Sequence, residues 1–365
     1  MEIILQKTIS LCEVCYRHVK AYTFENNGSI WLHKECNYHG SFTTLLEKKA
    51  SFYYDELLNN SLISTSQWHE PDGVIIEVTD RCNLTCPHCY HKPDNTLNDQ
   101  SIDSILTRVN NFPSYFKDII LAGAEPTVRK DLFELCNRII DNKRRIILCT
   151  NGVKLSNLDY TKQLKEMDVN NNVAVSISLN HPNYQGKVVH AKILEGIRNC
   201  LKLQLKIHSI SYTLETYDDL NFVLNEIQEL GRACTVYRLS GGANIGRCLN
   251  ELNPSLSKFV EEMFKVVHIN KWSYYKTLGT NLPNLYMVEI NGITHQIVKW
   301  SDVTSIDMEA SLQFKGGWTN FVPDKPITQY LHQIILRDRV INNKQPLYDT
   351  VSKRYWSKPI SNKLL

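Results

Sequence analysis

The chain has 365 residues, of which 42% are hydrophobic and 22% are charged, and its formal net charge at pH 7 is +3. These values are typical of a globular chain with a buried core, and so small a net charge gives no reason to expect nucleic acid as a partner. Eleven cysteines without a secretory signal favour a reducing, cytoplasmic location, and no run approaches the roughly 18 apolar residues that a membrane span requires.

Residues 1–50 form a small module that carries two metal half-sites. Cys12 and Cys15 make the first, and Cys36 and His39 make the second about twenty residues later. Residues 22–32 lie between them and read as two strands joined at an Asn-Gly turn. Four such ligands around a hairpin predict a zinc-ribbon or rubredoxin-like knuckle that binds zinc or iron. A module this small buries little surface, so the metal would supply folding energy, and four protein ligands would make the site structural.

Residues 51–72 read as a connecting segment with a short helix at 53–58, and residues 73–248 alternate strands with amphipathic helices. Strands are predicted at 74–79, 118–122, 145–150, 173–179, 206–212 and 235–239, with helices at 101–110, 130–141 and 190–201 among those between them. Such alternation predicts an α/β fold with a parallel sheet covered by helices. In parallel barrels, ligand-binding residues gather at the C-terminal ends of the strands.

Three cysteines follow the first of these strands within the sequence CNLTCPHC. Cys82, Cys86 and Cys89 place three thiolates on one short loop. This C-x3-C-x2-C spacing suits a [4Fe–4S] cluster that leaves one iron open for another ligand. Zinc usually takes four protein ligands in pairs, and Cys86 and Cys89 are too close for a comfortable disulfide.

The stretch from Glu77 to Tyr90 resembles the signature of the radical S-adenosylmethionine (SAM) superfamily. The resemblance implies a partial (β/α)6 barrel of the TIM type, a [4Fe–4S] cluster held by the three cysteines, and SAM at the open iron. The N-terminal module is similar to that of the members of this superfamily that make archaeal tetraether lipids or methylate methanopterin.

The second strand is followed by Gly123-Ala124-Glu125-Pro126, which resembles the GGEP motif of the superfamily. That motif contacts the amino group of SAM, so the resemblance implies that Gly123 and Glu125 bind the cofactor. Alanine replaces the second glycine, and it keeps a close backbone approach only if its φ is negative. Glu125 also has a purely structural interpretation, as a carboxylate at the start of a helix.

Three further strand ends resemble cofactor-binding positions. Asn151 lies in a Thr-Asn-Gly turn after the third strand, and Ser176 lies in a VSIS stretch on the fourth, where Ser178 replaces the usual aspartate. The resemblance also implies backbone contact with adenine near Leu239, and His88 takes the place of an aromatic residue that usually packs on the adenine. His181, in the loop after the fourth strand, is a candidate for reaching the substrate.

In residues 249–365 the alternating pattern stops, and we expect a mixed α+β cap over the open side of the barrel. A helix is predicted at 257–267, a hairpin at 285–298 and a second helix at 327–342. Candidate substrate contacts in this region, each also open to a structural interpretation, are Trp300, Asp302, His332 and Arg337.

The resemblance implies an enzyme in which reductive cleavage of SAM gives a 5′-deoxyadenosyl radical that abstracts hydrogen from a small-molecule or lipid-like substrate. An electron donor such as flavodoxin or ferredoxin is the expected partner. Two alternatives stay open. The N-terminal module could hold the leader of a peptide substrate, as in a radical SAM peptide maturase, or the chain could be a non-catalytic metal-binding scaffold.

Overall fold

The computed structural model describes residues 3–12, 14, 18–51, 73–89, 93–110, 117–241, 256–267, 271–275 and 285–298. The helices predicted at 53–58 and 327–342 lie outside these residues. So do the four candidate substrate contacts of the C-terminal region, which are Trp300, Asp302, His332 and Arg337.

The N-terminal module is a four-stranded antiparallel sheet in chain order, consisting of β1 (Ile3–Leu11), β2 (His18–Asn26), β3 (Ser29–Cys36) and β4 (Gly40–Glu47). The predicted hairpin is β2–β3, and its two turn residues, Asn27 and Gly28, have φ values of 51° and 75°. Positive φ at both central residues is the mark of a type I′ turn. This turn is favoured in two-residue hairpins because its twist matches the right-handed twist of the flanking strands. The two outer strands, β1 and β4, extend the hairpin that the sequence predicted.

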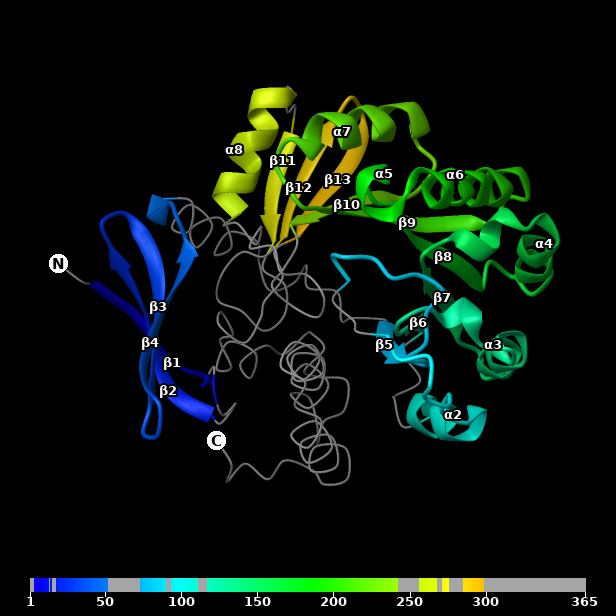
Figure 1. The fold of residues 1–365 in the computed structure, drawn as a ribbon, viewed down its shortest axis with the longest axis horizontal. Coiled ribbons are helices and arrows are strands. Elements are labelled where there is room, and N and C mark those ends of the chain that lie inside the picture. The colour runs from blue at the N-terminus through cyan, green and yellow to red at the C-terminus, as the bar shows by residue number, and fades with distance from the viewer. Residues whose placement is uncertain are drawn as a thin grey trace.

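Figure 1 shows this module at the left of the molecule, and its strand β4 and the residues after it contact helix α8 (Leu256–Val266). The carboxylate of Glu47 is buried and accepts hydrogen bonds from the backbone N–H and the hydroxyl of Ser257, and Lys49 pairs with Glu261. Residues far apart in the sequence therefore lie side by side.

The main sheet contains the six predicted parallel strands, which are β5 (Gly73–Glu77), β6 (Asp118–Ala122), β7 (Arg145–Thr150), β8 (Val173–Ser178), β9 (Lys206–Leu214) and β10 (Val236–Gly241). They pair in chain order with parallel register from β5 to β10. The predicted α/β partial barrel is confirmed.

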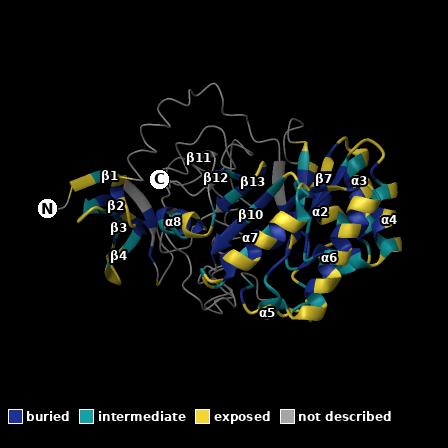
Figure 2. Cartoon of the chain, turned by 90° about the horizontal axis from the view of Figure 1, so that it is seen from above, coloured by how far each residue is buried: buried dark blue, intermediate teal, exposed yellow. Residues whose placement is uncertain are grey.

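The helices cover the outer, convex face of this sheet (Figure 1). They are α2 (Ile102–Asn110), α3 (Leu132–Asp141), α4 (Leu158–Glu166), α6 (Lys187–Lys202) and α7 (Asp219–Leu230), with the short α5 (Pro182–Gln185), η2 (Pro126–Val128) and η3 (Val153–Ser156). On α6, Ile193, Ile197 and Cys200 recur at helical spacing and are fully buried against the sheet, while exposed residues line the outside (Figure 2). No helix among the described residues is long and apolar enough to cross a membrane.

The predicted hairpin at 285–298 exists as β12 (Leu285–Ile290) and β13 (Ile293–Val298), and β11 (Lys271–Tyr275) pairs with β12. β13 pairs in parallel with β10, so the three strands continue the barrel sheet to nine strands. Among the described strands, β10 is therefore an inner strand of this sheet, and the domain boundary expected at residue 248 stays a prediction.

Candidate cluster and cofactor site

The loop with the three cysteines leaves the C-terminal end of β5 and is hydrogen-bonded to the loop that follows β6. Ala124 N–H donates to the carbonyl of Thr79 at 2.9 Å, and Glu125 N–H donates to the carbonyl of Arg81 at 3.0 Å. These backbone bonds continue the pairing of the two strands beyond their ends. The cysteine loop is therefore fixed to the Gly-Ala-Glu-Pro loop by main-chain contacts that do not depend on any ligand.

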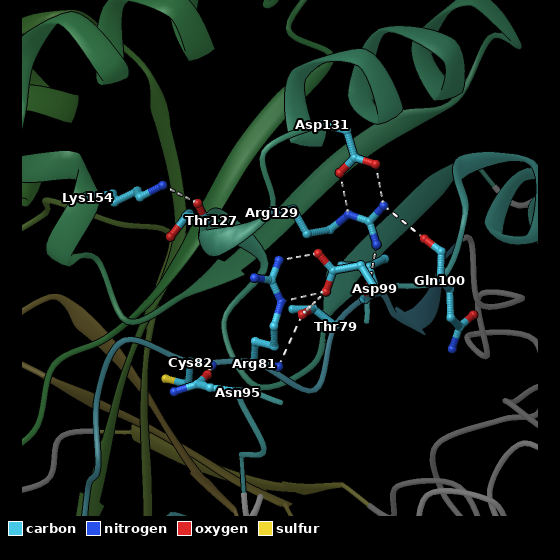
Figure 3. Close-up of polar contacts among 11 residues, drawn as sticks. Thr79, Arg81, Cys82, Asn95, Asp99, Gln100, Thr127, Arg129, Asp131 and Lys154 are labelled. Carbon is cyan, nitrogen blue, oxygen red and sulfur yellow. Dashed lines mark hydrogen bonds and ion pairs between the residues drawn. The ribbon is translucent and has the colours of Figure 1, made fainter. Parts of the chain in front are cut away.

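Two arginine–aspartate pairs anchor the base of the cysteine loop (Figure 3). Arg81 pairs with Asp99 through both carboxylate oxygens, and Thr79 Oγ1 donates to the same carboxylate at 2.6 Å. Burial alone would raise the pKa of Asp99, but its contacts with Arg81 and Thr79 outweigh burial and lower it. The buried Arg129 pairs with Asp131 and donates to the carbonyl of Val78, the residue directly after β5. Both arginines are thus held in fixed positions.

The thiols of Cys82, Cys86 and Cys89 have intermediate exposure, and the described cysteines form no disulfide. The Cys82 Sγ accepts from the N–H of Leu84 at 3.3 Å and lies 3.8 Å from Asn151 Nδ2. N–H donors to sulfur favour the thiolate, which is the form that ligates iron. A [4Fe–4S] cluster is bound through cysteine thiolates, and three of them on one loop leave one iron open for another ligand. This donor set fits a [4Fe–4S] cluster.

Glu125 is fully buried, and four donors converge on its carboxylate. Oε1 accepts from the N–H and hydroxyl of Thr127 and from Thr150 Oγ1, and Oε2 accepts from Asn151 N–H at 2.6 Å. Burial raises the pKa of Glu125, and these hydrogen bonds oppose that effect. The carboxylate also caps η2. Glu125 therefore does have the structural role that the sequence allowed, as a carboxylate at the start of a helix. A contact with SAM would use the remaining acceptor capacity of Oε2.

Gly123 and Asn151 join the neighbouring loops to the cysteine loop. Gly123 has φ +131°, and a Cβ there would lie 2.4 Å from the carbonyl oxygen of Thr79. Its need for glycine therefore comes from the close approach of the two loops. Asn151 Nδ2 donates to Asn83 Oδ1 at 2.8 Å, next to Cys82.

His88 is buried beside Asn180 and Glu215. Its Nε2 lies 2.7 Å from Asn180 Nδ2, and its Nδ1 lies 3.3 Å from Glu215 Oε1. Burial lowers the pKa of His88 to about 4, so the ring is neutral near pH 7 and its contact with Glu215 is a hydrogen bond more than an ion pair. With Asn180 donating to Nε2, the proton sits on Nδ1 and is donated to Glu215. Neither partner was predicted from the sequence, although Asn180 follows β8 at a strand end, where polar residues often bind ligands.

The remaining predicted cofactor residues differ in where they point. Ser176 Oγ lies 2.7 Å from Ser209 Oγ, and both residues lie on the face of the sheet turned away from the helices. Leu239 points the other way, into the apolar core, and its backbone is paired with β9 and β13 on both sides. The backbone contact with adenine expected near Leu239 stays a prediction. His181 accepts from Asn183 N–H and begins the short helix α5.

In the N-terminal module, Cys12, Cys36 and His39 come together. Their ligand atoms lie within 4.8 Å of one another, with His39 Nδ1 at 3.6 Å from Cys12 Sγ and 3.5 Å from Cys36 Sγ. The Tyr38 backbone N–H contributes most to lowering the pKa of Cys36 to about 6, which favours the thiolate. The geometry fits one tetrahedral ion. The fourth predicted ligand, Cys15, lies outside the described residues.

Comparison with known proteins agrees with this geometry. Residues 76–227 match the Radical SAM superfamily, and residues 4–48 match the HMPTM N-terminal zinc ribbon domain. The chain is 32% identical over 186 residues to 7,8-dihydro-6-hydroxymethylpterin dimethyltransferase of Methanocaldococcus jannaschii, covering 44% of this chain and 37% of that protein.

The chain is also 26% identical over 305 residues to a GTP 3′,8-cyclase of Clostridium perfringens, covering 80% of this chain and 91% of that protein. Among solved structures, SuiB of Streptococcus suis bound to S-adenosylmethionine aligns with a TM-score of 0.44 at 12% identity, covering 72% of this chain and 69% of that chain. The chain spans less than half the length of the pterin dimethyltransferase. The two family matches show that residues 76–227 are a radical SAM domain, whose cofactors are a [4Fe–4S] cluster and SAM, and that residues 4–48 are a zinc ribbon with a structural metal.

Proposed function

We propose that this chain is a radical SAM enzyme in which Cys82, Cys86 and Cys89 hold the [4Fe–4S] cluster. The observation that carries the proposal is the position of these thiols. They lie on one loop at the C-terminal end of β5, and that loop is hydrogen-bonded to the loops after β6 and β7. Three neighbouring strand ends therefore meet where parallel barrels place their chemistry.

The bound cluster and SAM would supply, after one-electron reduction, a 5′-deoxyadenosyl radical that takes hydrogen from a C–H bond. The residues of the chain orient the reactants. The Glu125 carboxylate accepts the backbone N–H of Asn151 and so fixes the turn there. The side-chain amide of Asn151 then contacts the Cys82 sulfur. The uncharged ring of His88, held by a hydrogen bond from Asn180, lines the proposed cofactor site beside Cys89. Gly123 and Ser176 remain proposed cofactor contacts, on the strand end and on the inner face of the sheet.

We propose a small molecule as the substrate, with reduction by a flavodoxin or ferredoxin and a cytoplasmic location. The supporting comparison is that the named relatives act on a pterin and on GTP, both small molecules. Cys12, Cys36 and His39, with Cys15, are proposed to bind the structural zinc of the ribbon.

The test is anaerobic. The protein is reconstituted with iron and sulfide, reduced with dithionite and mixed with SAM, and 5′-deoxyadenosine is measured by mass spectrometry. We expect the wild type to form this product and the Cys86→Ala variant to form none. Product formation by Cys86→Ala at the wild-type rate would contradict the assignment of the cluster, whereas a spectroscopically confirmed cluster without any product, even with candidate small molecules added, would favour a binding role.

A further inference from the structure

The inner face of the main sheet carries a row of polar side chains that includes the half-buried cation Arg238. The outward residues of β8, β9 and β10, such as Ile177, Tyr212 and Tyr237, belong to the apolar core beneath the helices. Side chains alternate along a strand, so the residues between them face the other side. On that inner side the sequence supplies serines, one arginine and one glutamine.

The strand register places four of these residues on one rung. Ser178 pairs with Ser211, Ser211 pairs with Arg238, and Arg238 pairs with Gln296 on β13. In a parallel sheet, residues on one rung point to the same side. Ser178 is exposed and the other three have intermediate exposure, so the rung is not closed to solvent.

Arg238 has no anionic partner among the described residues. Its Nε donates to Gln296 Oε1 at 2.8 Å, which fixes the plane of the guanidinium and leaves the Nη groups without a carboxylate. In contrast, each of five other arginines pairs with an Asp or Glu, namely Arg81, Arg129, Arg138, Arg145 and Arg198. A guanidinium that is fixed in orientation but unpaired is unusual, because removal of a charge from water is costly unless an anion compensates.

The nearby cysteines do not provide that anion. Burial raises the pKa of Cys149 and of Cys234 to about 11, so both remain neutral thiols near pH 7. Burial also lowers the pKa of Arg238, since desolvation disfavours its charged form. An incoming anion would relieve this penalty and would find a planar, bidentate donor.

We propose that Arg238, oriented by Gln296, binds a carboxylate or phosphate group of a small molecule that enters the barrel. This inference rests on the proposed function only in taking the inner face as the reaction chamber. The anion has two possible sources, the carboxylate of SAM itself or an acidic group of the substrate, and they are separated by experiment.

The first arm uses inorganic phosphate as the probe on full-length protein. Thermal unfolding is followed as phosphate replaces chloride at constant ionic strength. We expect phosphate to raise the Tm of the wild type, and the apparent affinity to fall about tenfold or more in Arg238→Gln, which corresponds to the loss of a charge-assisted hydrogen bond. The control is Arg198→Gln, on the exposed surface of α6, which should keep the wild-type response.

Gln296→Glu is a second variant that separates a loss of anion binding from a failure of Arg238→Gln to fold. It places a carboxylate against the Arg238 Nε, so the guanidinium gains an internal partner. We expect this variant to be at least as stable as the wild type and to lose the response to phosphate. A stable Gln296→Glu protein with an undiminished phosphate response would overturn the inference, as would equal responses of the wild type and Arg238→Gln.

The second arm identifies the source by equilibrium dialysis of SAM and of decarboxylated SAM against the reconstituted holoenzyme. If Arg238 binds the SAM carboxylate, Arg238→Gln weakens SAM about tenfold or more and leaves the decarboxylated analogue unchanged. If it binds the substrate, both cofactors bind as in the wild type while the phosphate response is lost. Because the phosphate arm needs no cluster, a failure of SAM cleavage would count against the proposed function and not against this anion site.

Discussion

Asn180 Nδ2 lies 2.7 Å from Nε2 of His88, and this bond joins the end of β8 to the loop that carries the cluster cysteines. Asn180 also accepts from the Thr213 N–H through its side-chain oxygen and from His190 through its backbone carbonyl. The residue therefore fixes the His88 ring from a rigid part of the sheet. A ring beside Cys89 that is held in this way can define one wall of the cofactor site without carrying a charge.

Replacing Asn180 with alanine should slow SAM cleavage while the cluster still loads. The variant leaves His88 Nε2 buried without a donor, and a misoriented wall residue reduces rates by roughly tenfold or more. The measurement is the rate of 5′-deoxyadenosine formation per cluster. Asn157→Ala is the control, since Asn157 caps the exposed start of α4 and its loss costs about 1 kcal/mol of stability without touching the site. Equal rates for Asn180→Ala and the wild type would show that Asn180 serves only stability.

Glu125→Gln should destabilise the protein even without SAM. Four donors point at the carboxylate. In glutamine an NH2 group replaces one of the two oxygens, so at least one of these buried donors would face another donor and lose its acceptor. We expect a loss of about 2–4 kcal/mol in the free energy of unfolding, measured by urea denaturation of the protein without SAM. Glu134→Gln, at an exposed position in the first turn of α3, should change stability by less than about 0.5 kcal/mol.

Gly123→Ala and Gly186→Ala form a matched pair that separates backbone strain from steric clash. Both glycines have positive φ, but a Cβ at Gly123 meets Thr79 O at 2.4 Å, whereas a Cβ at Gly186 has no atom within 4 Å. We expect about 1 kcal/mol of destabilisation at Gly186 from φ alone, and at least about 2 kcal/mol more at Gly123. Only Gly123→Ala should also reduce the iron bound per chain. Similar losses for both variants would mean that the two loops can move apart at little cost.

The strands of the barrel could be predicted from the sequence because each is a short β-branched run that ends at a polar motif. The strand from Asp118 to Ala122 and the one from Arg145 to Thr150 match the predicted bounds. The pairing of β13 with β10 could not be predicted, because the partner of a strand depends on long-range contacts that local patterns do not encode. That pairing matters for the site, since it buries the backbone of Leu239 and brings Gln296 to Arg238.

Site residues within motifs were predictable, and their partners were not. The spacing of Cys82, Cys86 and Cys89 is local, so it can be read along the chain. Asn180 and Glu215, which hold His88, are far from it in sequence and carry no motif. Arg238 was visible as a residue of the sixth strand, but only the register shows that its partners on the neighbouring described strands are Ser211 and Gln296, neither of them a carboxylate.

Cys36→Ala should remove the zinc of the N-terminal module while the cluster remains. Cys36, Cys12 and His39 converge on one point, so loss of one ligand leaves too few for tight binding. Metal analysis should show zinc falling from about one per chain to near zero with iron unchanged, and proteolysis should cut within residues 1–50. Cys136→Ala, in the core of the barrel, should retain its zinc. Full zinc content in Cys36→Ala would contradict the ligand assignment.

His190→Gln should cost stability in a pH-dependent manner. His190 Nε2 lies 2.7 Å from Glu226 Oε1, and Tyr212 donates to the other oxygen. Burial alone would lower the pKa of His190, but the hydrogen bond and charge of Glu226 outweigh it, so the net shift is upward from 6.5. A raised pKa in the folded state means that protonated His190 stabilises the fold. This contribution is complete below the unfolded pKa and is lost as pH rises through the folded value.

The free energy of unfolding of the wild type and of His190→Gln is therefore compared by urea denaturation between about pH 5.5 and pH 8.5. We expect the difference to be largest at the acidic end, at about 1–3 kcal/mol, and to shrink as pH rises, because only the charged imidazole gains from Glu226. His181→Gln is the control, since His181 caps the short α5 by accepting from Asn183 N–H and packs against the rings of Tyr184 and Phe222. A difference that stays constant across this range would show that His190 contributes by packing and hydrogen bonding alone, with no stabilising charge at the α6–α7 contact.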